Sequence, residues 1–194
     1  RTQVQIVRGD TYRLYVKGTT AKVKWYSSNA KIATVSNGKV TAKKKGTAVI
    51  YAKVNGKKYA CKVTVVTQQR AYIDTLQRQI NIQRRRYGFN SYDRNPLLQQ
   101  AAQKRAKELA EKFSHARPNG YSWASAISMR YNFKKASELT ARYYTDPQEV
   151  VDAWMSRAST KAKIISKRYH EIGVGVYLDE DGFLYYAVIV AVRK

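Results

Sequence analysis

The first third of the chain alternates apolar and polar residues, the pattern of strands that face a core on one side. The alternating runs are Tyr12, Leu14 and Val16; then Val23 and Trp25; then Ala48, Ile50, Ala52 and Val54. Turn sequences separate the runs, and Asn55-Gly56 is typical of a two-residue β-hairpin. Many short strands with turns about ten residues apart predict an all-β sandwich.

From Thr67 onward the spacing of apolar residues becomes helical. Three helices are expected: one with Ile73, Leu76 and Ile80 on one face, one starting at Asn95-Pro96, and one starting at Asp146-Pro147. Asp146 is a typical helix-capping residue, and proline, here Pro96 in the second helix, is favoured at the first helical position.

Two strands are expected at the end of the chain, over 171–178 and 183–192, joined by an Asp181-Gly182 turn. The last run is apolar on both faces, so helices should cover its sheet on both sides. The predicted fold is therefore two domains, an all-β sandwich over 1–66 and an α/β/α sandwich over 67–194.

The net charge indicates the class of partner, and the cysteine content excludes one class of protein. The 194 residues include 37 Lys and Arg against 13 Asp and Glu, a net charge of +24, which favours encounter with polyanions. A single cysteine, Cys61, excludes an intramolecular disulfide framework and is expected to be a buried thiol. We expect neither a transmembrane segment nor a signal peptide, and the start at Arg1 indicates a piece of a longer protein.

The first half resembles the group 2 bacterial immunoglobulin-like domain. The matching stretches are Trp25-Tyr26-Ser27-Ser28-Asn29, Ile32-Ala33-Thr34-Val35, Gly38-Lys39-Val40-Thr41-Ala42 and Gly46-Thr47-Ala48-Val49-Ile50. The resemblance implies a bacterial secreted or cell-surface location, with this domain as a spacer or adhesive unit.

The second half resembles the CAP superfamily, which comprises cysteine-rich secretory, antigen 5 and pathogenesis-related proteins. The match runs through Leu98–Ala110, Phe113–Gly120, Pro147–Met155 and Glu171–Gly175. The resemblance implies the CAP fold, an α/β/α sandwich.

CAP domains share a cleft lined by two His and two Glu, and the resemblance assigns three of these positions to His115, Glu138 and Glu171. The second His falls at Thr160, and Leu139 replaces the Asn that usually follows the first Glu. The implied tetrad therefore lacks one imidazole.

The residues themselves leave two interpretations of these positions open. Glu171 shares a strand face with Gly173 and Gly175, which would suit the floor of a cleft. Alternatively, the glycines relieve crowding against a helix and Glu171 accepts backbone hydrogen bonds. His115 follows the second helix, where it could instead cap the helix C-terminus as a cation.

Metal binding is judged from the number of ligands. A catalytic Zn²⁺ usually has three protein ligands that include imidazole or thiolate, and Thr160 cannot replace the lost nitrogen. We expect at most a weakly held divalent cation, Zn²⁺, Mg²⁺ or Ca²⁺, at His115, Glu138 and Glu171. No other cofactor is expected.

The predicted function is binding rather than turnover, because the tetrad is incomplete. The expected partner is an anionic polymer or glycan at the cell surface. Nucleic acid is not expected, because no recognition motif is present. Two alternatives stay open: a metal-assisted hydrolase acting on peptide or cell-wall material, and a lipid- or sterol-binding module.

Overall fold

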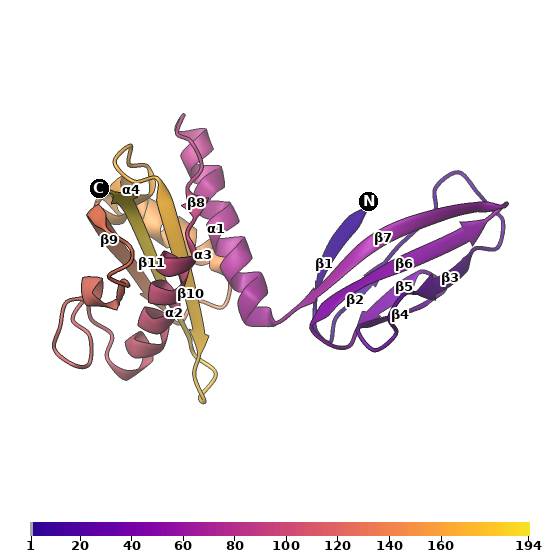
Figure 1. Ribbon diagram of the computed structural model, residues 1–194, viewed down its shortest axis with the longest axis horizontal. Coiled ribbons are helices and arrows are strands. Elements are labelled where there is room, and N and C mark those ends of the chain that lie inside the picture. Colours follow the sequence, from indigo (N-terminus) through magenta and orange to yellow (C-terminus); the bar gives the residue numbers. More distant parts are fainter. Residues whose placement is uncertain (1) are drawn as a thin grey trace. The chain divides into compact units, whose positions relative to one another are not determined.

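The computed structural model describes residues 2–194, and the chain divides into two compact units between Ala71 and Tyr72 (Figure 1). Among the described residues, no helix is both long enough and apolar enough to span a membrane. Each unit has its own hydrophobic core, as expected for separate domains.

The first unit is a sandwich of two β-sheets, as predicted. One sheet has the strand order β1-β7-β6-β3 and the other β2-β5-β4. The strands are β1 Gln3–Val7, β2 Thr11–Arg13, β3 Lys24–Ser27, β4 Ala33–Ser36, β5 Lys39–Ala42, β6 Gly46–Val54 and β7 Lys57–Val66. The core between the sheets includes Val40, Ile50 and Val63. Cys61 is a buried free thiol whose pKa is raised by burial.

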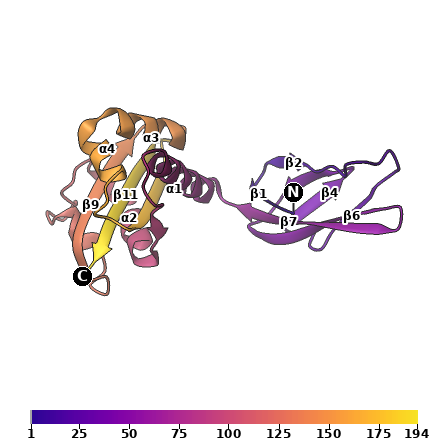
Figure 2. The same cartoon turned by 90° about the horizontal axis from the view of Figure 1, so that it is seen from above.

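The second unit is a four-stranded sheet with helices on both faces, and the strand order is β8-β10-β11-β9. Figure 2 shows α2 on one side of the sheet and α3 and α4 on the other. The elements are α1 Gln68–Arg86, β8 Asp93–Arg94, α2 Pro96–Glu111, β9 Phe133–Arg142, α3 Pro147–Ser156, α4 Ala158–Ile164, β10 Glu171–Leu178 and β11 Leu184–Arg193, with a 3₁₀ turn at Trp123–Ala126.

Strand β11 lies in the interior of this unit, because it is paired with β10 on one edge and with β9 on the other. Ile189 and Ala191 belong to the core under α2, and Val188 and Val190 belong to the core under α1, α3 and α4. An apolar run on both faces of a strand therefore marked a sheet covered on both sides, and the α/β/α prediction is confirmed.

The two predicted helix starts are also confirmed. The Asn95 side chain accepts hydrogen bonds from the backbone amides of Leu97, at 2.9 Å, and Leu98, at 3.2 Å. The Asp146 side chain accepts one from Gln148 at 2.8 Å. These bonds satisfy amides that have no partner within the helix, and so fix where α2 and α3 begin.

Gly173 and Gly175 pack against a helix and do not form the floor of a cleft. A Cβ atom at Gly173 would clash with the backbone of Leu98, and one at Gly175 would clash with the backbone of Ala102. The cleft-floor interpretation of these glycines is therefore wrong, and relief of crowding against a helix is correct. The expected backbone hydrogen bonds to Glu171 are wrong, because its carboxylate accepts from the side chains of Asn95, Tyr131 and Arg193.

The close approach of α2 also covers an open edge of the sheet. The short strand β8 pairs only with Glu171 and Ile172, the first two residues of β10. The backbone of Val174 and Val176 therefore has no neighbouring strand on that side. The side-chain amides of Gln99 and Gln103 hydrogen-bond these backbone groups instead. The helix thereby satisfies polar groups that an edge strand would otherwise leave exposed.

Candidate ligand-binding site

Arg105 of α2 is the buried centre of a polar network on the face of the sheet that α2 covers. Its side chain has no exposed surface. Its Nε donates to Glu138 Oε1 at 2.7 Å, its Nη1 to Glu108 Oε2 at 2.8 Å and its Nη2 to the Ser114 carbonyl at 2.7 Å. A buried guanidinium is tolerated only when it is paired and hydrogen-bonded, as it is here.

Glu138 is the acceptor that joins Arg105 to His115. It lies on β9 opposite Ile189, on the face that α2 covers, and its side chain is fully buried. One carboxylate oxygen accepts from Arg105, and the other lies 2.6 Å from Nδ1 of His115. Its backbone carbonyl accepts from Nζ of Lys163 in α4 at 2.9 Å. Both side-chain oxygens are thus used inside the protein.

His115 is the exposed member of this network. It lies in the loop after α2, where its backbone carbonyl accepts from the Trp123 amide at 3.0 Å. The side chain is 58% exposed although its partner Glu138 is fully buried. An ionised carboxylate only accepts hydrogen bonds, so Nδ1 carries the proton in this contact. Nε2 of a neutral ring is then an acceptor on the side away from Glu138.

A second arginine completes the network. Arg117 donates to both oxygens of Glu108, at 2.7 to 3.1 Å, and to the Ser125 hydroxyl at 2.9 Å. Burial raises the pKa of Glu108, but the hydrogen bonds and charges of Arg117 and Arg105 outweigh burial, and the pKa lies below its usual value.

Glu171 lies in a different hydrogen-bond network. Its Oε1 accepts from Nδ2 of Asn95 at 2.7 Å, and its Oε2 accepts from the Tyr131 hydroxyl at 2.6 Å and from Nε of Arg193 at 3.2 Å. Burial raises the pKa of Glu171, but these donors outweigh it and the net shift is downward. Because Asn95 caps α2, Glu171 orients the cap of that helix.

The structure therefore brings His115 and Glu138 together but not Glu171. Glu171 contacts the residue before the first turn of α2, whereas Glu138 contacts Arg105, ten residues later. Ten helical residues span about 15 Å along the axis. Each carboxylate has its own donors, and the two networks share no residue.

These residues do not fit the weak divalent-cation site that the sequence suggested. Within residues 2–194, no three His, Cys, Asp or Glu side chains are grouped so that they could hold a metal ion. Every carboxylate oxygen of Glu138 and Glu171 already accepts a hydrogen bond. Zn²⁺, Mg²⁺ or Ca²⁺ would have to displace those donors.

Thr160, at the position of the missing His, bonds to its own helical segment. Its hydroxyl lies 2.5 Å from the Trp154 carbonyl and 3.2 Å from the Arg157 carbonyl, at the junction of α3 and α4. Lys163, one turn further along α4, reaches the backbone of Glu138. Residues three apart lie on neighbouring turns of one helix face, so Thr160 lies on the side of α4 that turns toward β9.

Three residues of the network were missed in the sequence: Arg105, Glu108 and Arg117. The signal for the first two was a basic and an acidic residue three apart on one helix, which places them on one face. Arg105 also falls beside the apolar stripe of α2, where a charge needs a buried partner. Arg117 lies two residues after His115 in the same loop.

Comparisons with known proteins agree with both halves of the fold. Residues 77–191 match the CAP family, described as the cysteine-rich secretory protein family, and residues 1–65 match the bacterial Ig-like domain of group 2. A curated relative is the uncharacterized protein YkwD of Bacillus subtilis, 28% identical over 98 residues, or 49% of this chain. The chain covers 38% of that protein's length.

Solved structures share the fold at low sequence identity. An outer surface protein of Borrelia burgdorferi is 22% identical with a TM-score of 0.60, over 66% of this chain and 96% of that one. An extracellular SCP-domain protein of Bacillus anthracis is 16% identical with a TM-score of 0.57, over 81% of this chain and 54% of that one. At these identities the likeness establishes the fold alone.

The buried Arg105–Glu138 pair gives a prediction about stability. Glu138→Leu leaves a guanidinium buried without its main partner, and should lower the free energy of unfolding of the second unit by about 3–5 kcal/mol. Adding Arg105→Met should recover a large part of that loss. Denaturant unfolding followed by helical circular dichroism reports on this unit, because all the described helices lie in it or begin at its boundary. A double variant no more stable than Glu138→Leu would contradict the pairing.

The lowered pKa of Glu108 predicts a dependence of stability on pH. A carboxyl group with a lower pKa in the folded state binds fewer protons than in the unfolded chain, so its contribution is full above the ordinary Glu value of about 4.3 and is lost as the pH falls through the folded pKa. Glu108→Gln should therefore flatten the acid limb of unfolding free energy against pH. Exposed Glu180→Gln serves as the control. Parallel acid limbs for wild type and Glu108→Gln would refute the linkage.

Proposed function

The chain belongs to the cysteine-rich secretory protein (CAP) family and carries a group 2 bacterial Ig-like domain, and we propose that it is an extracellular binding protein whose CAP domain engages its ligand at His115. The observation that carries this proposal is a half-exposed imidazole held by a fully buried carboxylate. A ring fixed in this way is presented to solvent in one orientation, as a binding group requires.

The charge balance of the network supports a binding role for His115. Arg105 and Arg117 are opposed by Glu108 and Glu138, so the four charged side chains cancel. All four are buried or nearly so, whereas the His115 side chain is 58% exposed. The imidazole is therefore the group through which this network meets a ligand.

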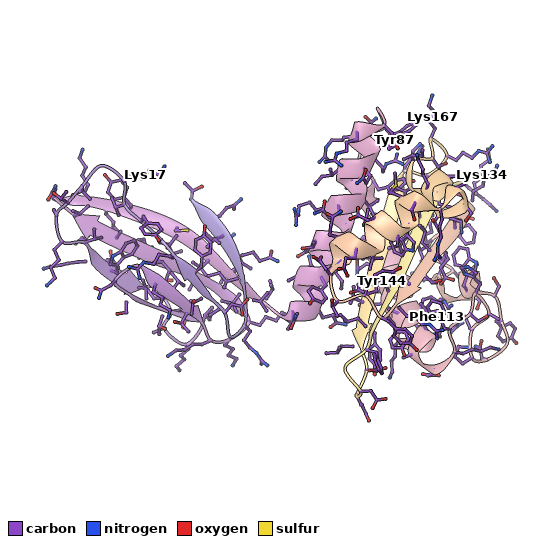
Figure 3. The ribbon with its side chains drawn as sticks, turned by 180° about the vertical axis from the view of Figure 1, so that it is seen from behind. Lys17, Tyr87, Phe113, Lys134, Tyr144 and Lys167 are labelled. Atoms are coloured by element: carbon purple, nitrogen blue, oxygen red, sulfur yellow. The ribbon has the colours of Figure 1, made fainter. Side chains whose placement is uncertain are left out.

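We take the ligand class to be an acidic glycan or glycan-linked polymer of the cell surface. The net charge of +24 favours anionic partners. Phe113, two residues before His115 and labelled in Figure 3, is 39% exposed, and the Arg142 guanidinium lies 4.5 Å from its ring centre. The Phe113 ring and the Arg142 guanidinium offer both apolar contact and charge to such a ligand.

An extracellular location fits the family and the Ig-like domain. Two structural neighbours carry the same indication in their names, one an outer surface protein and one an extracellular protein. In this proposal the Ig-like domain is a spacer or adhesive unit that presents the CAP domain.

The alternative of a hydrolase is favoured by one feature, the His115–Glu138 contact itself. A carboxylate that orients an imidazole is the arrangement used by a general base. Hydrolysis also needs a nucleophile or a second proton carrier near the ring. Within residues 2–194, no hydroxyl, thiol or further carboxyl group hydrogen-bonds the His115 ring. Binding is therefore the better-supported function, and lipid or sterol binding stays a prediction.

We predict that soluble acidic cell-wall glycan fragments bind at His115. In an NMR titration of the full chain, amide signals of the loop around Ala116 and Trp123 should shift saturably. His115→Ala should weaken the affinity about ten-fold or more, because a charged or polar contact contributes on the order of 1.5 kcal/mol or more. His170→Ala is the matched control, since His170 is exposed and bonds through its backbone.

The same samples distinguish binding from turnover. If the CAP domain binds the fragments without hydrolysing them, the fragments should keep their length over days of incubation, with or without EDTA. Shortening of the fragments by wild type but not by His115→Ala would establish the hydrolase instead. Equal affinity for wild type and His115→Ala would remove His115 from the site.

A further inference from the structure

The Ig-like domain carries a row of three lysines on the outer face of its larger sheet. Lys24 of β3 pairs directly with Lys53 of β6, and Lys53 pairs directly with Lys58 of β7. Directly paired residues in an antiparallel sheet point to the same face, and all three lysines are exposed. Figure 1 shows β3, β6 and β7 side by side in this sheet.

A row of three lysines lowers the stability of the sheet, so its presence on this face calls for a reason other than folding. Like charges directly opposite each other destabilise a sheet. No salt bridge among the described residues includes any of the three lysines, and Asp10 is the only acidic residue within 1–66. Protection of a sheet edge accounts for Lys24 on the edge strand β3 and for Lys58, where β7 extends beyond its pairing with β1. It does not account for Lys53, which lies between two paired strands.

The next row of the same face holds two stacked tyrosines. Tyr26 and Tyr51 are directly paired, with ring centroids 4.9 Å apart and an interplanar angle of 25°. Ala60 lies opposite Tyr51 on β7, and Nζ of Lys58 lies 3.9 Å from the Tyr51 ring centre. The small Ala60 leaves room for Lys58 beside the ring. The tyrosine pair thus holds one ammonium group of the lysine row in place.

Further along the face, Lys62 of β7 adds another exposed ammonium group, opposite Val49. Lys24, Lys53, Lys58 and Lys62 with Tyr26 and Tyr51 are named here the lysine–tyrosine face. Neighbouring strands are about 4.8 Å apart, so the row of three lysines spans about 10 Å across the sheet. An extended ligand with repeated negative charges complements such a row.

We propose that the lysine–tyrosine face binds a linear anionic polysaccharide. Charge complementarity identifies the class of partner, because the face is purely cationic and the domain has a single acidic residue. Binding of single-stranded nucleic acid uses open aromatic faces on which bases stack. Here Tyr51 is covered by Tyr26 on one side and contacted by Lys58 as well, so it offers no free platform.

The face belongs to the Ig-like domain and His115 to the CAP domain, so this inference goes beyond the proposed function of the CAP domain and does not depend on it. It gives the Ig-like domain a binding role in addition to that of a spacer. Failure of one proposal leaves the other intact, because the variants that test them lie in different domains.

The test uses the full chain, size-fractionated heparin as the anionic polysaccharide, and two triple variants of equal charge change. Lys24→Gln/Lys53→Gln/Lys58→Gln removes the row, and Lys43→Gln/Lys44→Gln/Lys45→Gln removes three exposed lysines at the β5–β6 connection. The first variant should bind heparin about ten-fold more weakly or worse, with a shallower dependence of log Kd on log salt, since fewer counterions are released. The second variant should stay close to wild type.

A thermal measurement completes the test. Removing three mutually repelling charges should leave the melting temperature of the Ig-like domain unchanged or raise it, so weaker binding cannot come from unfolding. Equal loss of heparin binding in both triple variants would mean that only the net charge of the protein matters, and would overturn the proposal. Competition by millimolar inorganic phosphate, or tighter binding of single-stranded DNA than of heparin through the same lysines, would also overturn it.

Discussion

The buried ion pair between Arg105 and Glu138 is the interaction on which the CAP domain's candidate site depends. It ties α2 to β9 and, through the Ser114 carbonyl, to the loop that carries His115. The helix lies close enough to the sheet because Gly173 and Gly175 have no side chains to separate them. Removing Glu138 would leave the Arg105 charge buried without its partner and would also release the imidazole of His115. The stability of the domain and the orientation of this imidazole therefore depend on one carboxylate.

Much of the fold follows from hydrophobic pattern and capping chemistry. An apolar run on both faces predicted the doubly covered β11. Pro96 and the capping residue Asp146 predicted where two helices begin. The face of Glu171, Gly173 and Gly175 was assigned correctly from alternation, but alternation does not tell what covers a face. Here α2 covers it, so the glycines serve packing and Glu171 supports the helix cap.

The site itself was less predictable, because its residues break the patterns that reveal structure. Strand β9 was not expected from the sequence, since Glu138 stands on a buried face where alternation calls for an apolar residue. Arg105 likewise lies on the buried side of α2. Such local violations are typical of functional positions. Only the family resemblance pointed to His115 and Glu138, and it grouped them with Glu171, which the structure places at the other end of α2.

The most direct test of this account is the protonation pattern of the His115 ring, measured by nitrogen-edited NMR in the full chain at a pH where the ring is neutral. His170→Gln removes the only other imidazole and assigns the signals. The account predicts a proton on Nδ1, donated to Glu138, and a bare Nε2 that responds when acidic glycan is added. A neutral ring protonated on Nε2, with an Nδ1 unaffected by Glu138→Gln, would contradict it.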